Sequence, residues 1–188
     1  MRVFDFDKTL TIKDTTLDFF CFGLSKGNTI LCTVLYYVLA SSVKLGFLSV
    51  LSLKIILLRL RFKNVGLDEW SMHCQSFAKT IKTNKLYTQV NWRELDLLII
   101  SASFKEVLQH LFPYSVKVFA TTVKCENGKW QIEDHLYRSR KREVLIENGI
   151  QEIDEFYTDS WHDRSVIEMA KKIYWVKGNQ VTELKANR

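Results

Sequence analysis

Residues 2–11 have the sequence RVFDFDKTLT, a short β-prone run that ends in two aspartates. On a regular strand Asp5 and Asp7 would share one face, and a turn beginning at Phe6 is expected to aim both at one site. A solvated turn would account for a single acid. Two carboxylates this close repel each other unless a cation offsets them. The stretch therefore predicts a strand that brings a ligand, a metal or a reaction to the edge of a sheet.

Composition sets the bounds of the fold. The chain has 188 residues, 47% of them hydrophobic, with one proline and seven glycines. This is enough for the core of one domain plus an insertion. The four cysteines are widely spaced and form no CxxC pair, which indicates reduced thiols in a cytoplasmic protein. Because Asp5 and Asp7 interrupt the first apolar run, no signal peptide is expected.

The net charge of +6 is concentrated in one segment. Between Phe19 and Leu67 there is no acidic residue, whereas the rest of the chain is balanced. A localised excess of this kind disfavours a diffuse nucleic-acid-binding surface, so no nucleic-acid partner is expected. The sequence leaves the oligomeric state unknown. The six basic residues of the segment are Lys26, Lys44, Lys54, Arg59, Arg61 and Lys63.

Hydrophobic periodicity predicts a buried strand, a long helical segment, and then alternating strands and helices. This order is typical of a parallel sheet with helices on both faces, whose ligands bind at the carboxyl ends of the strands. Asn127-Gly128 is expected to turn a hairpin, and Gly149 to end a helix. The expected strands are 2–6, 95–101, a hairpin within 116–132, 153–160 and 174–178, and the expected helices of the second half are 104–112, 139–149 and 163–173.

The helical segment contains a charge-free run of 17 residues at 27–43. A spanning helix usually needs about 20 apolar residues, so a buried hairpin, or one lying in the membrane interface, is favoured over a transmembrane helix. Its leucine and phenylalanine side chains would then insert into an anionic bilayer, with the lysines and arginines on headgroups. Packing on the core or on a second copy is the alternative.

Four motifs resemble those of the haloacid dehalogenase-like (HAD) superfamily, in the order and spacing of its phosphoserine-phosphatase-like branch. They are DFDKT at 5–9, LLIIS at 97–101, a lysine near the start of a helix (Lys141), and DSWHD at 159–163. The resemblance implies an α/β fold, a Rossmann-like parallel sheet with an inserted all-helical cap. The catalytic core would comprise 1–14 and 86–188, and the cap 15–85.

The resemblance also implies a phosphate monoester hydrolase. Asp5 is similar to the nucleophile that forms an aspartyl phosphate, and Asp7 to the general acid and base. Ser101 would bond a phosphoryl oxygen, with Ser103 as its competitor. Lys141 would neutralise the nucleophile and the phosphate.

The same resemblance implies a magnesium site, and carboxylate ligands without soft donors suit this ion. Asp5, the backbone carbonyl of Asp7, and Asp159 would hold the Mg²⁺. Asp163 would lie behind the metal, where it fixes a water or the lysine.

The chain departs from the family pattern in the third and fourth motifs. Lys141 is crowded by Arg138, Arg140 and Arg142, so either the lysine or a neighbouring arginine could fill the role of the cation. Thr158 stands where a glycine usually precedes the last motif.

The substrate is less well defined by the resemblance than the reaction. Asp14 and Thr9 are assigned to substrate binding, since Asp14 matches an acid at the mouth of the cap that binds an amine in phosphoserine phosphatases. The apolar, basic cap and the last segment resemble bacterial phosphatidylglycerophosphate phosphatases. This favours a membrane lipid phosphate, met at the inner face of the membrane through peripheral contact with anionic lipid. The alternative is a soluble small-metabolite phosphatase. A phosphotransfer ATPase and an inactive scaffold are disfavoured by the intact acid pair.

Overall fold

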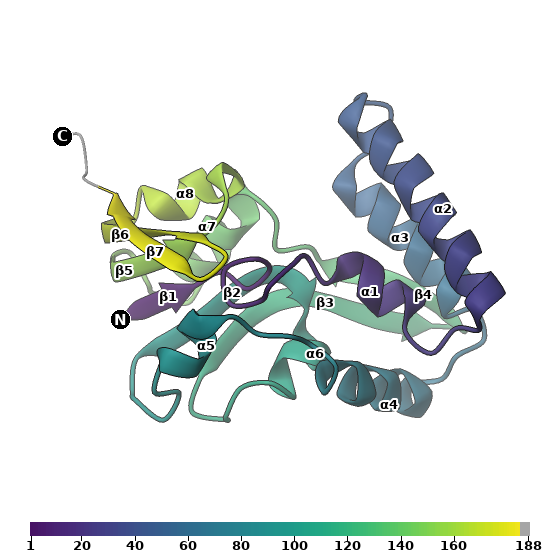
Figure 1. Cartoon of the computed structure of the whole chain (residues 1–188), viewed down its shortest axis with the longest axis horizontal. Helices are drawn as coiled ribbons and strands as arrows, with labels where there is room; N and C mark the ends of the chain where they lie inside the picture. The colour runs from purple at the N-terminus through teal and green to yellow at the C-terminus, as the bar shows by residue number, and fades with distance from the viewer. Residues whose placement is uncertain (185–188) are drawn as a thin grey trace.

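The computed structural model describes residues 1–184, which form one seven-stranded sheet, helices on both of its faces, and four further helices to one side (Figure 1). The strands are β1 (Arg2–Phe4), β2 (Leu97–Phe104), β3 (Lys117–Glu126), β4 (Lys129–Asp134), β5 (Ile153–Thr158), β6 (Ala170–Lys177) and β7 (Gln180–Leu184). The helices are α1 (Thr16–Cys21), α2 (Lys26–Lys44), α3 (Val50–Arg61), α4 (Leu67–Ala78), α5 (Lys85–Gln89), α6 (Lys105–Gln109), α7 (Ser139–Glu147), the single turn η1 (Trp161–Asp163) and α8 (Arg164–Ile167).

The sheet has the strand order β4-β3-β2-β1-β5-β6-β7. Strands β3, β2, β1, β5 and β6 are parallel, and β4 and β7 add one antiparallel strand at each edge. The predicted α/β fold with a parallel sheet is confirmed. Because β1 lies between β2 and β5, the residues that follow these three strands meet at one edge of the sheet.

Alternation along the central strands explains why helices cover both faces. Val3 and Leu98 pack with Leu145 of α7 and Val166 of α8. The next residues along, Phe4 and Ile99, face the other way and pack in a cluster with residues of α5 and α6.

Helices α1 to α4, which we call the cap helices, pack around a third apolar cluster that also includes residues of β2, α6 and β4. Trp130 of β4 stacks on Trp70 of α4 with 4.6 Å between ring centroids, and its indole Nε1 donates to the carbonyl of Val65 at 3.0 Å. The cap helices are thereby fixed to the β3–β4 hairpin. Within residues 1–184, no helix is both long and apolar enough to cross a membrane.

The chain enters and leaves the cap helices through two adjacent segments. Thr11 and Thr83 form an isolated antiparallel bridge, and the amide of Ile12 donates to the carbonyl of Lys82 at 3.1 Å. Asn84, which is buried, donates its side-chain amide to the carbonyls of Thr9 at 2.8 Å and Gly178 at 3.0 Å. This junction lies directly beside the turn that carries Asp5 and Asp7.

Local predictions succeed where turn residues decide the backbone. Asn127 and Gly128 have φ values of 50° and 71° and join β3 to β4, as predicted. Gly149, at φ 77°, follows the end of α7, also as predicted.

Several boundaries differ from the prediction. The first strand ends at Phe4 rather than at residue 6, since Phe6 accepts the hydrogen bonds of a turn from the amides of Thr9 and Leu10. The predicted helix 163–173 is wrong beyond its first turns: α8 ends at Ile167, and Ala170–Lys177 pairs with β5 as strand β6. Strand β7 was not predicted. Strand β2 runs beyond the predicted end at Ser101 to Phe104, which occupies the N-cap position of α6.

Candidate active site

Asp5 and Lys141 form a buried ion pair at the carboxyl edge of the sheet. The amide of Asp5 donates to the carbonyl of Tyr157 in β5 at 2.9 Å, which fixes the aspartate just beyond β1. The ammonium of Lys141, from α7, lies 2.7 Å from Asp5 Oδ1 and 2.6 Å from Asp163 Oδ1. Burial alone would lower the pKa of Lys141, but the carboxylates of Asp5 and Asp163 raise it above its ordinary value. Lys141 therefore remains charged and joins Asp5 of the DFDKT motif to Asp163 of the DSWHD motif.

The neighbouring arginines point elsewhere, so the geometry distinguishes them from Lys141. Arg140 pairs with Asp134 at 2.9 Å and with Glu147 at 2.6 Å. Arg142 pairs with Glu168, and the guanidinium of Arg138 lies 5.2 Å from the centroid of the Tyr137 ring. Of the four basic residues, Lys141 alone lines the cavity that contains Asp5.

Asp7 is held at both carboxylate oxygens. Its Oδ1 accepts from the amide of Thr15 at 2.8 Å and from the hydroxyl of Thr15 at 2.7 Å. Its Oδ2 accepts from the hydroxyl of Ser103. Burial raises the pKa of Asp7, with a further contribution from Asp14, while these hydrogen bonds act in the opposite direction. A fixed carboxyl with a raised pKa is suited to exchanging a proton with a group in the cavity.

The two serines of β2 have different contacts. Ser101 is buried, lines the cavity, and accepts the amide of Ser103 on its Oγ at 3.0 Å. Its hydroxyl hydrogen can therefore be donated into the cavity. Ser103 donates to Asp7 and does not line the cavity. From the sequence, Ser103 was predicted only as the alternative to Ser101 for bonding a phosphoryl oxygen. In the structure its hydroxyl contacts Asp7 instead.

Asp159 and Asp163 lie in different surroundings. Asp163 is buried, with one oxygen on Lys141 and the other accepting from the hydroxyl of Thr158 at 2.9 Å. Asp159 lines the cavity, where burial raises its pKa and the nearby Lys8 lowers it in part. Thr158, which departs from the family pattern, also accepts the amide of Ser160 at 3.1 Å and thereby supports the loop.

The two predicted substrate-binding residues lie in different places. Asp14 is exposed, lines the cavity, and accepts the amide of Thr16 on its Oδ1 at 2.8 Å. Thr9 is fully buried behind Asp5, to which its hydroxyl donates at 3.3 Å, and it does not line the cavity. The structure thus brings Asp14 to the cavity but places Thr9 against Asp5.

Lys54 is a cavity residue that the sequence analysis assigned to a surface. It extends from α3, is buried, and donates to the carbonyl of Ala102 at 2.6 Å. Burial lowers the pKa of Lys54 to about 8, against the opposing effect of Asp7 and Asp14. A signal was present, because Lys54 recurs at helical spacing with Leu57 and Leu58, the buried residues of α3.

The cavity is negatively charged and has a volume of about 190 Å³. It is bordered by five carboxylates and three lysines, an excess of two negative charges. Its lining residues are Asp5, Asp7, Lys8, Asp14, Thr16, Val50, Lys54, Ser101, Ala102, Tyr137, Lys141, Asp159, Ser160, His162 and Asp163.

These residues fit a divalent cation only if backbone oxygen takes part. Within the described chain, no group of three or more histidine, cysteine or acidic side chains is placed to hold a metal ion. Asp163 is also engaged by Lys141 and Thr158. The carboxylates of Asp5 and Asp159 border one cavity, and the backbone carbonyl of Asp7 would supply a third oxygen. This all-oxygen set suits Mg²⁺, and the excess of negative charge favours it.

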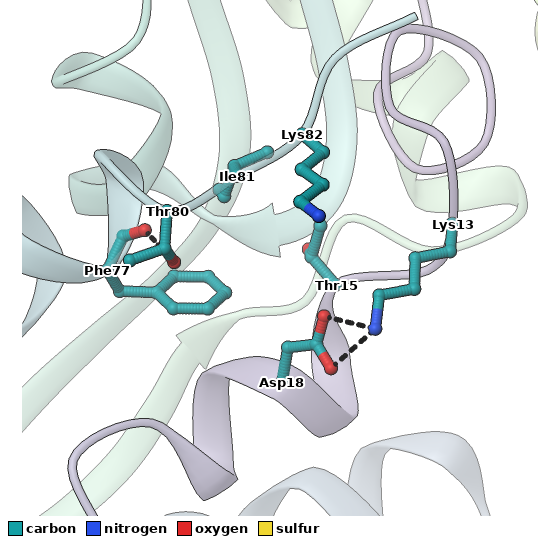
Figure 2. Close-up of a pocket in the computed structure, with 7 residues that line it drawn as sticks. All are labelled: Lys13, Thr15, Asp18, Phe77, Thr80, Ile81 and Lys82. Atoms are coloured by element: carbon teal, nitrogen blue, oxygen red, sulfur yellow. Dashed lines mark hydrogen bonds and ion pairs between the residues drawn. The ribbon is translucent and has the colours of Figure 1, made fainter.

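A second cavity lies at the cap junction (Figure 2). The ammonium of Lys13 pairs with Asp18 at 2.8 Å, and Figure 2 shows the side chain of Lys82 running toward Thr15. Thr15 borders this cavity while its amide and hydroxyl hold Asp7. The cap junction and the position of Asp7 are therefore linked through one residue.

Comparison with protein-family models and with curated proteins finds no match for this chain. Solved structures do match. A protein with unknown function from Bordetella pertussis Tohama I is 18% identical with a TM-score of 0.68, over 92% of this chain and 87% of that one. A HAD family hydrolase from Salmonella enterica subsp. enterica serovar Typhi is 13% identical with a TM-score of 0.65, over 90% of this chain and 59% of that one. A phosphoserine phosphatase in apo form is 18% identical with a TM-score of 0.56, over 92% and 83%.

The chain therefore has the HAD-like fold of the phosphoserine phosphatase type, as its four motifs predicted. At these identities the likeness establishes the fold and leaves the activity to be argued from the site. The resemblance to phosphatidylglycerophosphate phosphatases stays a prediction.

Proposed function

We propose that this protein is a magnesium-dependent phosphate monoester hydrolase that acts through an aspartyl phosphate on Asp5. The observation that supports this most directly is the arrangement of Asp5 and Asp7, which border one cavity in different environments. Asp5 is paired with the ammonium of Lys141, whereas Asp7 accepts hydrogen bonds from Thr15 and Ser103. Burial raises the pKa of both carboxyls, that of Asp5 to about 7 against the opposing effect of Lys141. Two carboxyls whose surroundings differ in this way can divide the roles of nucleophile and acid. In this proposal residues 15–85 form the cap, and 1–14 with 86–188 form the catalytic core.

In the first step a carboxylate oxygen of Asp5 attacks phosphorus, and the bond from phosphorus to the leaving oxygen breaks. Asp7 gives its proton to that oxygen, so the product leaves as an alcohol. Lys141 favours the ionised form of Asp5, whose pKa burial raises to about 7, and the hydroxyl of Ser101 donates to a phosphoryl oxygen.

In the second step a water attacks the aspartyl phosphate, and the bond from phosphorus to the Asp5 oxygen breaks. Asp7, now ionised, takes a proton from that water. Inorganic phosphate is released, and both aspartates return to their starting states. The hydrogen bonds from Thr15 and Ser103 hold Asp7 in one position through both proton transfers.

When bound, Mg²⁺ would offset the charge between the carboxylates and the phosphate. We therefore expect turnover to vanish with a chelator and to return with Mg²⁺. Because Mg²⁺ would bind the folded state, it should also raise the melting temperature. At a concentration 100 times its Kd, the free energy of unfolding should rise by about 2.7 kcal/mol. Asp159→Asn should weaken this thermal shift, while Asp68→Asn, an exposed acid of α4, should leave it unchanged. A rate that survives exhaustive chelation would contradict the metal assignment.

The cavity favours a small, polar leaving group, which is the soluble-metabolite alternative. Only Val50 and Ala102 among its lining residues are aliphatic, so little apolar surface is present for an acyl chain. Lys54 and Asp14 offer one cation and one acid beyond the reacting aspartates. Phosphoserine, the substrate named for a structural neighbour, carries both charges and is the first compound to test. A lipid phosphate with its headgroup in the cavity is the second candidate, motivated by the apolar face of α2.

The test is a phosphatase screen over soluble and lipid phosphomonoesters, with Asp5→Asn as the inactive reference. Asp5→Asn should abolish both turnover and covalent labelling by phosphate. Asp7→Asn should slow turnover by about 10²–10⁴-fold, the usual share of general acid–base catalysis. Asp68→Asn serves as the matched control. Full activity in Asp5→Asn would refute the nucleophile assignment.

A further inference from the structure

Helix α2 has an apolar face that nothing in residues 1–184 covers. No residue of α2 is buried, and its inner side chains, such as Leu35 and Leu39, only partly pack against the cap cluster. The α2–α3 hairpin rises away from the sheet at the upper right of Figure 1. We define the α2 face by its exposed residues: Ile30, Leu31, Val34, Tyr37, Val38, Leu45 and, just beyond the helix, Phe47.

The residues of the α2 face recur at helical spacing, and the exposed Ser41 lies between the apolar group at 30–38 and the two apolar residues at the hairpin tip. Val34 and Val38 are one turn apart, and Leu45 lies three turns beyond Val34. The face ends at the hairpin tip, where the side chains of Leu45 and Phe47 are 71% and 81% exposed. Exposed apolar side chains gathered on one side of a helix mark a binding site, whereas single exposed leucines do not.

Two lysines flank the α2 face on the same side. Lys26 and Lys44 are 18 residues apart, which is five full turns, so they project in one direction. Tyr37 lies along the same flank, and both lysines are exposed. Neither lysine has an ion-pair partner within residues 1–184, and no acid occurs between Phe19 and Leu67.

Other basic residues of the segment are not available to lipid. Lys54 is in the active-site cavity, and Arg61 donates to the carbonyls of Phe20 at 3.2 Å and Phe22 at 3.0 Å. The expectation that the whole basic set meets headgroups is therefore wrong for these two residues. The charge that α2 itself presents comes from Lys26 and Lys44.

We propose that the α2 face docks on an anionic lipid bilayer, with α2 lying in the plane of the interface. An interfacial helix needs an apolar stripe inserted among acyl chains and basic groups at headgroup level, and α2 has both. A second copy of the chain is a poorer occupant. Antiparallel helices would bring Lys26 of one copy toward Lys44 of the other, and parallel helices would place like lysines together, and α2 itself has no acidic residue to offset them. The proposal does not depend on the phosphatase assignment.

The experiment is flotation of the full chain with vesicles of phosphatidylcholine alone or with added phosphatidylglycerol. The protein is expected to float with the anionic vesicles at low salt, and less at high salt, since exposed charges are screened. Lys26→Gln and Lys44→Gln should each lower partitioning roughly fivefold, the value of one basic group near an anionic surface. The matched controls Lys85→Gln and Lys117→Gln change exposed lysines of the core and should have no effect.

A second pair of variants tests whether the apolar residues of the α2 face insert into the bilayer. Phe47→Ser should reduce flotation strongly, whereas Leu95→Ser, at a site 84% exposed outside the cap helices, should not. Hydrolysis of a small soluble phosphomonoester and the melting temperature should be unchanged in both. Absence of flotation at every salt and lipid composition would overturn the proposal. So would a dimer, measured by light scattering, that Phe47→Ser dissociates, because it would assign the α2 face to a second copy.

Discussion

The two sides of the candidate active-site cavity surround a buried lysine with different partners. On the sheet side, Lys141 lies between Asp5 and Asp163, within 2.7 Å of each. On the cap side, Lys54 donates to the carbonyl of Ala102, and its ammonium lies 5.8 Å from the centroid of the Phe104 ring. The sheet side is therefore a self-contained set of paired charges, while the cap side presents a cation whose charge is not matched by any contacting acid.

The pKa values express this difference. The carboxylates around Lys141 overcome the effect of burial and raise its pKa, whereas burial lowers the pKa of Lys54 to about 8. One lysine stabilises the fold in its charged form, and the other costs stability in its charged form. A buried charge that costs stability is a candidate for binding, because an anionic ligand would supply the missing partner.

The largest expected effect comes from removing the paired lysine. Lys141→Met leaves Asp5 and Asp163 as uncompensated buried carboxylates, so the free energy of unfolding should fall by about 3–5 kcal/mol. Urea or thermal denaturation of the metal-free protein measures this loss, and turnover should be abolished as well.

Arg142→Met is the matched control on the same helix. Its ion pair with Glu168 is half exposed, so the loss should stay within about 1 kcal/mol. If the two variants are equally stable, the pairing on the sheet side does not stabilise the fold.

The sheet side was the more predictable half of the site. In the sequence, Asp5, Asp7, Ser101 and Asp159 each fall at or beside the end of a predicted strand, and the topology of parallel sheets brings such positions to one edge. Turn chemistry located the hairpin at Asn127-Gly128 for an equally local reason. Lys141, by contrast, was expected from the family resemblance, and choosing it over the neighbouring arginines required the coordinates.

The cap side was less predictable because its assignments depend on tertiary packing. Lys54 was counted as a surface charge, although α3 presents it among buried leucines. The same dependence on tertiary packing holds for two residues of the sheet side, Ser103 and Thr158, which donate to other side chains in contacts that no spacing rule specifies. The second half of β6 was predicted correctly as a strand from residue 174, but its first half, Ala170–Ile173, was predicted as the end of a helix. Lys171 and Lys172, which are exposed, resemble a solvated helical face.

A smaller effect, of opposite sign, is expected at Lys54. Lys54→Met removes a buried charge without orphaning an acceptor, since the carbonyl of Ala102 still accepts from the hydroxyl of Thr121 at 2.8 Å. The free energy of unfolding should therefore rise by about 1–2 kcal/mol near pH 7, because burying an unpaired charge is costly. The KM for an anionic substrate should rise about tenfold or more, since charge-assisted hydrogen bonds are worth about 1.5–3 kcal/mol.

Lys63→Met, at an exposed position beyond α3, is the control and should change neither quantity. A loss of stability in Lys54→Met would show that the bond to Ala102 outweighs the cost of burial. The contrast between the two sides of the cavity would then disappear.

The smallest expected effect is a pH dependence of the stability that Lys54→Met gains over the wild type. It tests whether the buried charge of Lys54 is the cause of that gain. The pKa of Lys54 is about 8 in the folded protein and 10.5 is its ordinary value. Below pH 8 the lysine is charged in both states, so the wild type bears the full cost. Between pH 8 and 10.5 the unfolded chain binds the extra proton, so the stability of the wild type rises with pH.

The difference in unfolding free energy between Lys54→Met and the wild type should therefore shrink as the pH rises through this window, at up to about 1.4 kcal/mol per pH unit. Asp7, Asp14 and Lys141 face Lys54 in the cavity, and His135 lies near enough for its own pKa to be lowered by Lys54. These groups are present in both proteins, so their own titration largely cancels in the difference. Denaturation of both proteins at pH 7, 8, 9 and 10 measures it. A difference that stays constant across this range would mean that Lys54 is not the titrating group, and that its bond to Ala102 holds it charged as firmly as two carboxylates hold Lys141.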